Sequence, residues 1–213
     1  MVGSAPAFGQ RLYAGEVAKA GKPNIVLTGF MGTGKTTVGR LLAVELGLEL
    51  VDTDAIIEAR HGPIALIFDE RGEAAFRQIE RDVAAELAGR DGLVISTGGR
   101  MMLDPANRVS LGGNGDIYCL AATADEIFER VTADGSAATR PLLAGPDPRQ
   151  RIVDLLAERA AEYARFTQVT TGGRPPKAIA ADIIKSRTPR PNIGGGILGT
   201  VRSMIRRINK GDS

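Results

Sequence analysis

The stretch Gly29-Phe-Met-Gly-Thr-Gly-Lys35-Thr36 has residue types and spacing that suit phosphate binding. It fits the pattern G-x-x-x-x-G-K-[ST] at every fixed position and stands between a short apolar run and a helical one. Its glycines let backbone N–H groups surround a triphosphate, Lys35 adds a positive charge, and the Thr36 hydroxyl can bind Mg²⁺. We therefore expect a nucleoside triphosphate with Mg²⁺, held by Gly32, Thr33, Gly34, Lys35, Thr36 and Thr37.

Two carboxylates, Asp52 and Asp54, follow the second apolar run of the chain. Ligands of open α/β sheets bind at the carboxyl ends of the strands, which is where this pair would lie. On an extended segment both side chains point the same way, so one can serve the metal and the other can accept a hydroxyl proton. An Asp pair that opens a helix can also be no more than an N-cap.

Arg77 and Glu80 are three residues apart in a predicted helix and therefore share one face. Glu80 can hold the Arg77 guanidinium in one orientation, and the guanidinium can then bind a substrate carboxylate through two hydrogen bonds. The alternative is a solvated ion pair on the helix surface, which is common and contributes little to stability.

Three further segments carry groups that could contact a small ligand. Gly98 and Gly99 follow a predicted strand and allow a ligand to approach the backbone closely. Arg140 ends a loop of small residues, of the kind that closes as a lid, where it could offset the charge of a transferred phosphoryl group. Arg159 and Tyr163 are four residues apart on the next predicted helix and share a face.

The elements that must position these residues alternate along the chain. The predicted strands are 25–28, 48–51, 93–96, 116–120 and 167–171. The predicted helices are 35–46, 54–60, 63–70, 73–88, one from about residue 104, 123–132, 149–164 and 176–185. This alternation predicts a three-layer α/β fold in which helices cover both faces of a parallel sheet, with lid and substrate-binding excursions.

Length and composition indicate one globular domain, because 43% of the 213 residues are hydrophobic and 24% are charged. Residues 1–22 predict a flexible leader, residues 23–186 hold all the motifs, and residues 187–213 begin with a Pro/Gly linker. From residue 185 onward seven Lys and Arg face one acid, so the preceding residues have a net charge of −4. No nucleic-acid partner is therefore expected for the body of the protein.

The end of the chain predicts a basic amphipathic helix, because apolar residues between Ile197 and Ile208 recur at helical spacing opposite arginines. It could dock on the acidic body, a second subunit, an acidic partner or a membrane surface. No apolar run is long enough to span a membrane, and the single cysteine, Cys119, reads as a packed strand residue that cannot form an internal disulfide. We expect a cytoplasmic protein.

In this order the motifs resemble those of the shikimate kinases, in the nucleoside-monophosphate-kinase-like branch of the P-loop fold. The similarity runs over about residues 24–186. Besides the phosphate-binding loop, the matching elements are Asp52-Thr-Asp54, Ile-Phe-x-x-x-Gly-Glu-x-x-Phe-Arg-x-x-Glu at 67–80, the glycine turn at 98–99, Arg-Pro-Leu-Leu-Ala-Gly at 140–145, and Arg159 with Tyr163.

The resemblance implies ATP-dependent phosphorylation of the 3-hydroxyl of shikimate, giving shikimate 3-phosphate and ADP, in aromatic amino acid biosynthesis. The residues that it implies for shikimate are Asp54, Arg77, Gly99 and Arg159, beside the turn residue Gly98. Those implied for catalysis are Lys35, Asp54 and Arg140. Thr36 and Asp52 would serve Mg²⁺, and Arg140 and Arg174 would reach ATP, Arg174 near the adenine.

Arg100 departs from the family pattern, whose turn usually has three glycines. Its side chain could crowd the substrate site, add a third arginine to the anion pocket, or extend into solvent, which is the direction we expect for a loop arginine. An altered site would suit a kinase for another small hydroxy acid. The alternative that is not an enzyme is a non-catalytic nucleotide-binding or regulatory module. The presence of Lys35, Thr36, Asp54 and Arg140 argues against it.

Overall fold

The computed structural model describes residues 22–133, 143 and 146–187. The predicted leader up to residue 21, Arg140 in the predicted lid, and the predicted linker and basic helix from residue 188 onward lie outside the described residues. Nearly all of the predicted site therefore falls within the described part.

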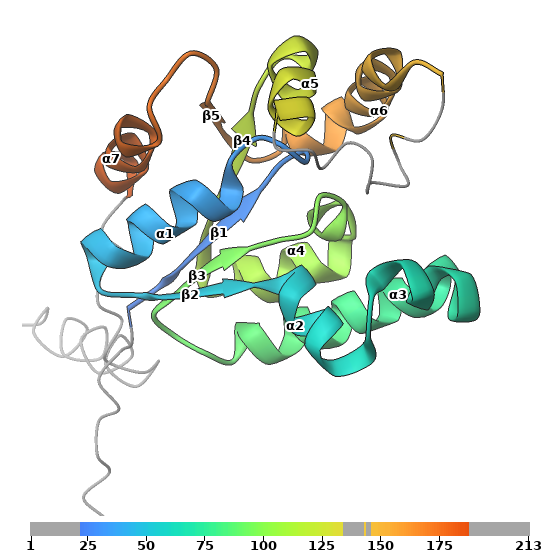
Figure 1. The fold of residues 1–213 in the computed structure, drawn as a ribbon. Helices are drawn as coiled ribbons and strands as arrows, with labels where there is room; N and C mark the ends of the chain where they lie inside the picture. Colours follow the sequence, from blue (N-terminus) through green and yellow to red (C-terminus); the bar gives the residue numbers. More distant parts are fainter. Residues whose placement is uncertain (1–21, 134–142, 144–145, 188–213) are drawn as a thin grey trace, which may run out of the picture. The chain divides into compact units, whose positions relative to one another are not determined.

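Strands and helices alternate along the described residues (Figure 1). The strands are β1 (Asn24–Thr28), β2 (Glu49–Asp52), β3 (Leu93–Ser96), β4 (Gly115–Ala121) and β5 (Thr167–Thr170). The helices are α1 (Lys35–Leu46), α2 (Thr53–His61), α3 (Ile64–Ala88), η1 (Met101–Leu103, a 3-10 turn), α4 (Pro105–Gly112), α5 (Ala124–Ala133), α6 (Pro148–Tyr163) and α7 (Pro176–Ser186). The predicted strands and helices are confirmed, and the structure adds the short turn η1.

The five strands form one parallel sheet in the order β2-β3-β1-β4-β5, which confirms the predicted fold class. β1 pairs with β3, and β3 pairs with β2, so their carboxyl ends meet at one edge. The segments that follow Thr28, Asp52 and Ser96 therefore lie close together. This edge is where open parallel sheets bind ligands.

Helices cover both faces of the sheet, as the alternation of side chains along each strand requires (Figure 1). Leu27 of β1 packs in one cluster with Leu42 of α1 and with side chains of α7. Val26, the preceding residue, belongs to the opposite cluster with Leu87 of α3 and with side chains of η1 and α4. The core is mainly aliphatic, in keeping with the low aromatic content of 4%.

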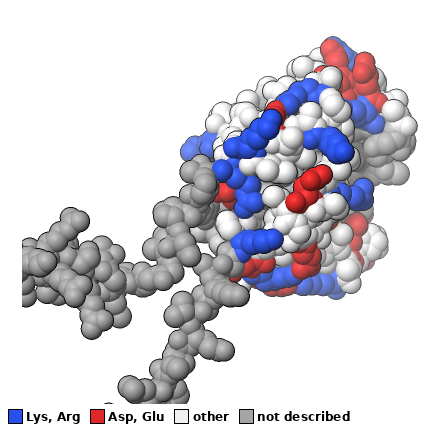
Figure 2. All heavy atoms as spheres, turned by 90° about the vertical axis from the view of Figure 1, so that its left-hand side faces the viewer, with Lys and Arg blue, Asp and Glu red and all other residues white. Residues whose placement is uncertain are grey.

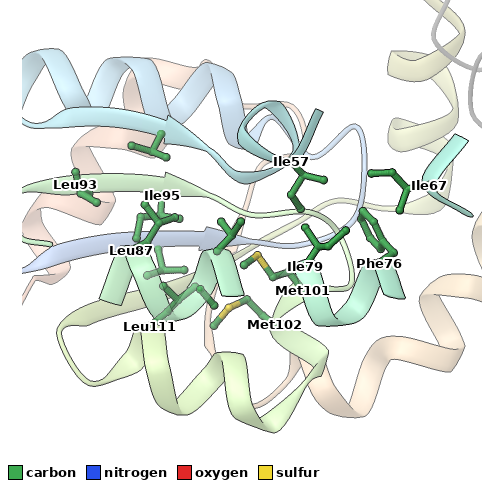
Figure 3. Packing of buried hydrophobic residues seen from close by; sticks show 14 residues of the cluster. Ile57, Ile67, Phe76, Ile79, Leu87, Leu93, Ile95, Met101, Met102 and Leu111 are labelled. Atoms are coloured by element: carbon green, nitrogen blue, oxygen red, sulfur yellow. The ribbon is translucent and has the colours of Figure 1, made fainter. Parts of the chain in front are cut away.

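α3 contains a kink at Gly72, whose φ of 77° and ψ of 169° are not helical. The sequence predicts one helix on either side of this point, and the non-helical geometry of Gly72 confirms the break between them. The part after Gly72 is anchored by Phe76, Ile79 and Leu87 in the cluster drawn in Figure 3. Its exposed side is thereby held in a fixed orientation toward the edge of the sheet where ligands bind.

Cys119 of β4 is buried, and burial raises the pKa of its thiol to about 11. Such a thiol is protonated near neutral pH and is a poor nucleophile. The prediction of a packed strand residue is confirmed.

The surface drawn in Figure 2 carries Lys and Arg side chains interspersed with Asp and Glu side chains. Charges of both signs therefore lie on this face. Across the described ranges, none of the helices has the length and apolar character needed to cross a membrane.

Candidate active site

A pocket of about 410 Å³ brings together residues from the segments that follow β1, β2 and β3, with others from α3 and α6. Eleven of the predicted site residues line it: Gly32, Gly34, Lys35, Thr36, Thr37, Asp52, Asp54, Arg77, Gly98, Gly99 and Arg159. The pocket thus joins the predicted nucleotide residues to the predicted acceptor residues.

The phosphate-binding loop ends at Gly34, which caps α1 with a φ of 91°. This left-handed conformation favours glycine, because a Cβ would strain the backbone there. α1 begins at Lys35, and no side chain of the described residues caps its first turn. The N-terminal turn of a helix is a suitable place for an anion, because its backbone N–H groups point along the axis toward the ligand. The positive end of the helix dipole adds to this preference.

Lys35 lies over its own loop, where Nζ donates hydrogen bonds to the carbonyl oxygens of Gly29 at 2.8 Å and Phe30 at 2.9 Å. The Thr33 hydroxyl donates to the same Phe30 oxygen at 2.7 Å and is buried. Thr33 therefore stabilises the shape of the loop and does not line the pocket, whereas Lys35 lies at its wall.

Thr36 and Asp52 meet beside the loop, with Thr36 Oγ1 donating to Asp52 Oδ2 at 3.2 Å. The other Asp52 oxygen caps α2 by accepting the backbone N–H groups of Asp54 at 3.1 Å and Ala55 at 3.4 Å. Asp52 therefore caps α2 with one carboxylate oxygen and has the other beside Thr36, where a metal ion could bind. A hydroxyl and a carboxylate are oxygen donors of the type that Mg²⁺ takes, so this pair fits the ion.

The expected extended arrangement of the two aspartates is wrong, because α2 starts at Thr53 and Asp54 lies in its first turn. Both side chains nevertheless reach the same pocket. Asp54 packs against Gly98, where an added Cβ would lie 2.6 Å from Asp54 Oδ1. Gly98 N–H also donates to the buried Thr53 hydroxyl at 3.0 Å, which joins the glycine turn to the start of α2.

Arg77 and Glu80 form an ion pair in which Arg77 Nη1 lies 2.6 Å from Glu80 Oε2. Glu80 is 2% exposed, so the alternative of a solvated surface pair is wrong. Burial raises the pKa of Glu80 against the opposing pull of Arg77, and the charge of Asp54 raises it further. Arg77 also donates to Glu73 and lies over the Phe76 ring, which fixes its guanidinium at the pocket wall.

Arg159 comes from α6 and is 2% exposed, with its guanidinium 5.2 Å from the centre of the Phe30 ring. Within the described part of the chain its Nε and Nη2 atoms have no hydrogen-bond partner. One turn later, the Tyr163 hydroxyl donates to the Gly99 carbonyl at 2.6 Å and so holds the glycine turn against α6. A buried cation with unused donors is an evident place for a ligand anion.

Besides Thr33, two predicted residues are not among the described residues that line this pocket. Arg140 lies outside the described residues. Arg174 pairs with Asp182 of α7 and donates to the Thr170 carbonyl, and it does not line the pocket. The geometry of the pocket therefore does not support the role near the adenine that the resemblance implies for Arg174.

Arg130 is a residue that sequence reasoning missed. Its Nη1 atom donates to the Gly32 carbonyl at 3.2 Å and to the Thr171 hydroxyl at 3.0 Å, and Nη2 donates to the Thr171 carbonyl. It therefore ties the phosphate-binding loop to the segment after β5. Nothing in the local pattern of α5 marks this residue, because its partners are distant in sequence.

Comparisons with known proteins agree with this geometry. The family model for shikimate kinase matches residues 31–188. The shikimate kinase of Halorhodospira halophila is 45% identical over 172 residues, which are 79% of this chain and 95% of the relative. That of Hahella chejuensis is 42% identical over 168 residues, which are 78% of this chain and 86% of the relative.

The fold is similar as well. A solved shikimate kinase from Acinetobacter baumannii, in complex with shikimate, has a TM-score of 0.71 at 37% identity and covers 77% of this chain and 92% of its own. Sequence and structure thus agree over most of the length of both proteins. The chain belongs to the shikimate kinase family.

Proposed function

We propose that this chain transfers the γ-phosphoryl group of ATP to the 3-hydroxyl of shikimate, releasing ADP and shikimate 3-phosphate. The observation that carries the proposal is the pocket itself, which is lined by Lys35 and by the guanidinium-bearing residues Arg77 and Arg159. Such a pocket suits a triphosphate together with a small acceptor that bears a carboxylate.

Arg77 and Arg159 would bind the carboxylate of shikimate. Each guanidinium is held at the pocket wall, Arg77 by Glu73 and Glu80 and Arg159 by burial against Phe30. Fixing the carboxylate at one end determines which hydroxyl lies next to the γ-phosphate, and positioning of this kind provides much of the rate enhancement in phosphoryl transfer. The backbone at Gly98 and Gly99 would contact the ring.

Asp54 would accept the proton of the acceptor hydroxyl. As the hydroxyl oxygen forms its bond to the γ-phosphorus, the bond to the β–γ bridging oxygen breaks and leaves ADP. Asp54 lies between Gly98 and the start of α2, which restricts its movement. The assignment is supported by the position of Asp54 in the pocket, next to Gly98.

The nucleotide phosphates would bind the loop from Gly32 to Thr37, and Lys35 would exchange its contacts with the loop carbonyls for the β- and γ-phosphates. Thr36 and Asp52 would hold Mg²⁺. The ion, when bound, neutralises charge on the transferred phosphoryl group. Arg140 would act from the lid, whereas Arg174 would reach the nucleotide only by leaving Asp182.

We also propose that residues 23–186 form the kinase domain and that the protein works in the cytoplasm. The first proposal is supported by the location of all the motif residues within that range, and the second by the single, buried Cys119. Docking of the basic tail on the body, on a second subunit or on an acidic partner stays a prediction about residues outside the described part.

Identification of the product tests the proposed reaction. The full chain is incubated with Mg²⁺, ATP and shikimate, and the product is analysed by phosphorus and proton NMR. We expect a monophosphate ester on the 3-hydroxyl, with Asp54→Asn giving little product and an unchanged circular dichroism spectrum. An ester on another hydroxyl, or equal product from Asp54→Asn, would contradict the assignment.

A further inference from the structure

Arg100 lines the pocket and forms an ion pair with Glu73 of α3. Its Nη1 atom lies 3.2 Å from Glu73 Oε1, and its side chain is 38% exposed. The expected direction into solvent is therefore not what the structure has. The arginine that replaces a glycine bridges the glycine turn to α3.

The Glu73 oxygen that pairs with Arg100 also accepts two hydrogen bonds from Arg77, from Nε at 3.1 Å and from Nη2 at 2.9 Å. One carboxylate oxygen thus joins two guanidiniums that would otherwise repel each other. The hydrogen bonds from Arg77, together with the charges of Arg77 and Arg100, lower the pKa of Glu73. Glu73 is therefore ionised at neutral pH and the bridge is present under ordinary conditions.

The backbone on each side of the bridge is anchored differently. Arg100 directly precedes Met101 and Met102, which are fully buried in the cluster shown in Figure 3. Glu73 directly follows the kink at Gly72, where α3 has no continuous helical geometry. A contact from the rigid turn to Glu73 therefore restrains the less constrained of the two segments.

Arg77 is one turn beyond Glu73, and its orientation depends on that residue. Glu73 accepts from the Nε and Nη2 side of the guanidinium, and Glu80 accepts from Nη1. Glu80 is buried, whereas the Glu73 side chain is 52% exposed, so the pair with Arg100 adds a restraint that burial does not provide. Arginine binds a carboxylate better than lysine does when its planar guanidinium is held in one orientation. Loss of one of the two carboxylates that orient Arg77 should therefore lower its affinity for a ligand carboxylate.

We propose that Arg100 is a positioning residue for the acceptor carboxylate: it holds Glu73 in place, and Glu73 orients Arg77. The inference rests on the proposed reaction and deepens it, because it assigns a role to the position at which this chain departs from the usual glycine turn. Arg100 itself does not need to contact shikimate for this role.

The first test compares Arg100→Ala and Arg100→Lys in the full chain. For Arg100→Ala we expect the KM and the calorimetric Kd for shikimate to rise about two- to fivefold, the scale of one partly exposed ion pair. The kcat and the KM for ATP should stay within about twofold, because neither nucleotide contacts nor Asp54 are altered. Arg100→Lys should recover most of the affinity, since an ammonium can also pair with Glu73.

Arg81→Ala is the matched control. Arg81 lies on the same helix as Glu73, has a similarly exposed side chain at 36%, and pairs with Asp104 at 3.0 Å away from the pocket. Its loss should leave both KM values unchanged. Thermal unfolding of every variant shows whether a change in KM accompanies a loss of folded protein.

The second test repeats Arg100→Ala in a Glu73→Ala background, where an arginine that acts through Glu73 should have no further effect. An equal rise in KM in both backgrounds would mean direct contact with shikimate and would overturn the proposal. An unchanged KM for shikimate in Arg100→Ala would also overturn the proposal. A lower KM would overturn it as well, because it would mean that Arg100 crowds the pocket. If the native chain shows no shikimate-dependent turnover, the proposed reaction itself fails, and this outcome is seen before any variant is made.

Discussion

Arg77 Nη1 lies 2.6 Å from Oε2 of Glu80, a carboxylate that is almost completely removed from solvent. Burying a carboxylate is costly unless a cation compensates it, so the pair is strongly coupled. Arg77 is in turn more exposed than its partner and lines the pocket. The buried member therefore orients the member that can contact a ligand.

Arg77→Lys should weaken shikimate binding with little effect on ATP binding. A lysine keeps the positive charge near Glu80 but loses the planar fork that matches a carboxylate. We expect the loss to be about 1.5–3 kcal/mol, the scale of a hydrogen bond to a charged group. Titration calorimetry with each ligand measures both affinities, and equal shikimate affinity in the two proteins would remove Arg77 from the acceptor site.

Lowering the pH should weaken shikimate binding through Glu80. Burial, opposed by Arg77 and reinforced by the charge of Asp54, raises the pKa of Glu80 above its ordinary value of 4.5. As pH falls toward that raised pKa, Glu80 becomes neutral and attracts Arg77 less, so the KM for shikimate should rise at a pH where an ordinary Glu is still ionised.

The control for this pH dependence is the Glu80→Gln variant, which has every titrating group of the native chain except Glu80. It should have a higher KM for shikimate at neutral pH and should lack the additional rise as pH falls. Initial rates measured from neutral pH downward, to the lowest pH at which both proteins stay folded, give the two profiles. Profiles that run parallel would assign the pH dependence to another group.

Arg159→Met should stabilise the fold and abolish most of the shikimate affinity. Arg159 is a buried cation with two nitrogen atoms that have no hydrogen-bond partner among the described residues. Replacing it by an apolar side chain of similar length removes the cost of keeping that charge and those donors away from water. Chemical denaturation gives the free energy of unfolding. A strong loss of stability would show that the arginine is required for packing against Phe30.

Gly98→Ala should lower turnover without unfolding the protein. The new Cβ would lie 2.6 Å from Asp54 Oδ1, so the carboxylate must move away from its present position. A displacement of about 1 Å at a reacting group can reduce the rate about a hundredfold, and we expect kcat to fall by about ten- to a hundredfold. Gly89→Ala is the control, because the nearest atom to its added Cβ is the carbonyl oxygen of Glu86, at an ordinary 3.5 Å.

Much of the fold could be predicted from the sequence because its signals are local. The apolar runs of β1 and β3 predict buried strands, and Gly34 with Lys35 marks the start of α1. The parallel sheet follows from the alternation of strands and helices. The sequence also predicts most of the pocket residues, since they follow the carboxyl ends of those strands.

Other features depend on contacts between distant segments. Glu80 is buried close to Gly98, which is 18 residues away in the sequence. Arg100 pairs with Glu73, which directly follows the kink at Gly72. The spacing of Arg77 and Glu80 predicts that the two side chains form an ion pair, but it does not predict whether that pair is buried or exposed. The position of Asp54 in the first turn of α2, rather than on an extended segment, depends on the cap formed by Asp52.

The most direct test of the central claim is the rate of ADP release by the full chain, measured in a coupled assay with Mg²⁺ and ATP, with and without shikimate. We predict slow release without shikimate and strongly stimulated release with it, and no stimulation in Lys35→Ala or Asp54→Ala. Native protein whose ADP release does not respond to shikimate, or Asp54→Ala that responds as the native chain does, would contradict the account.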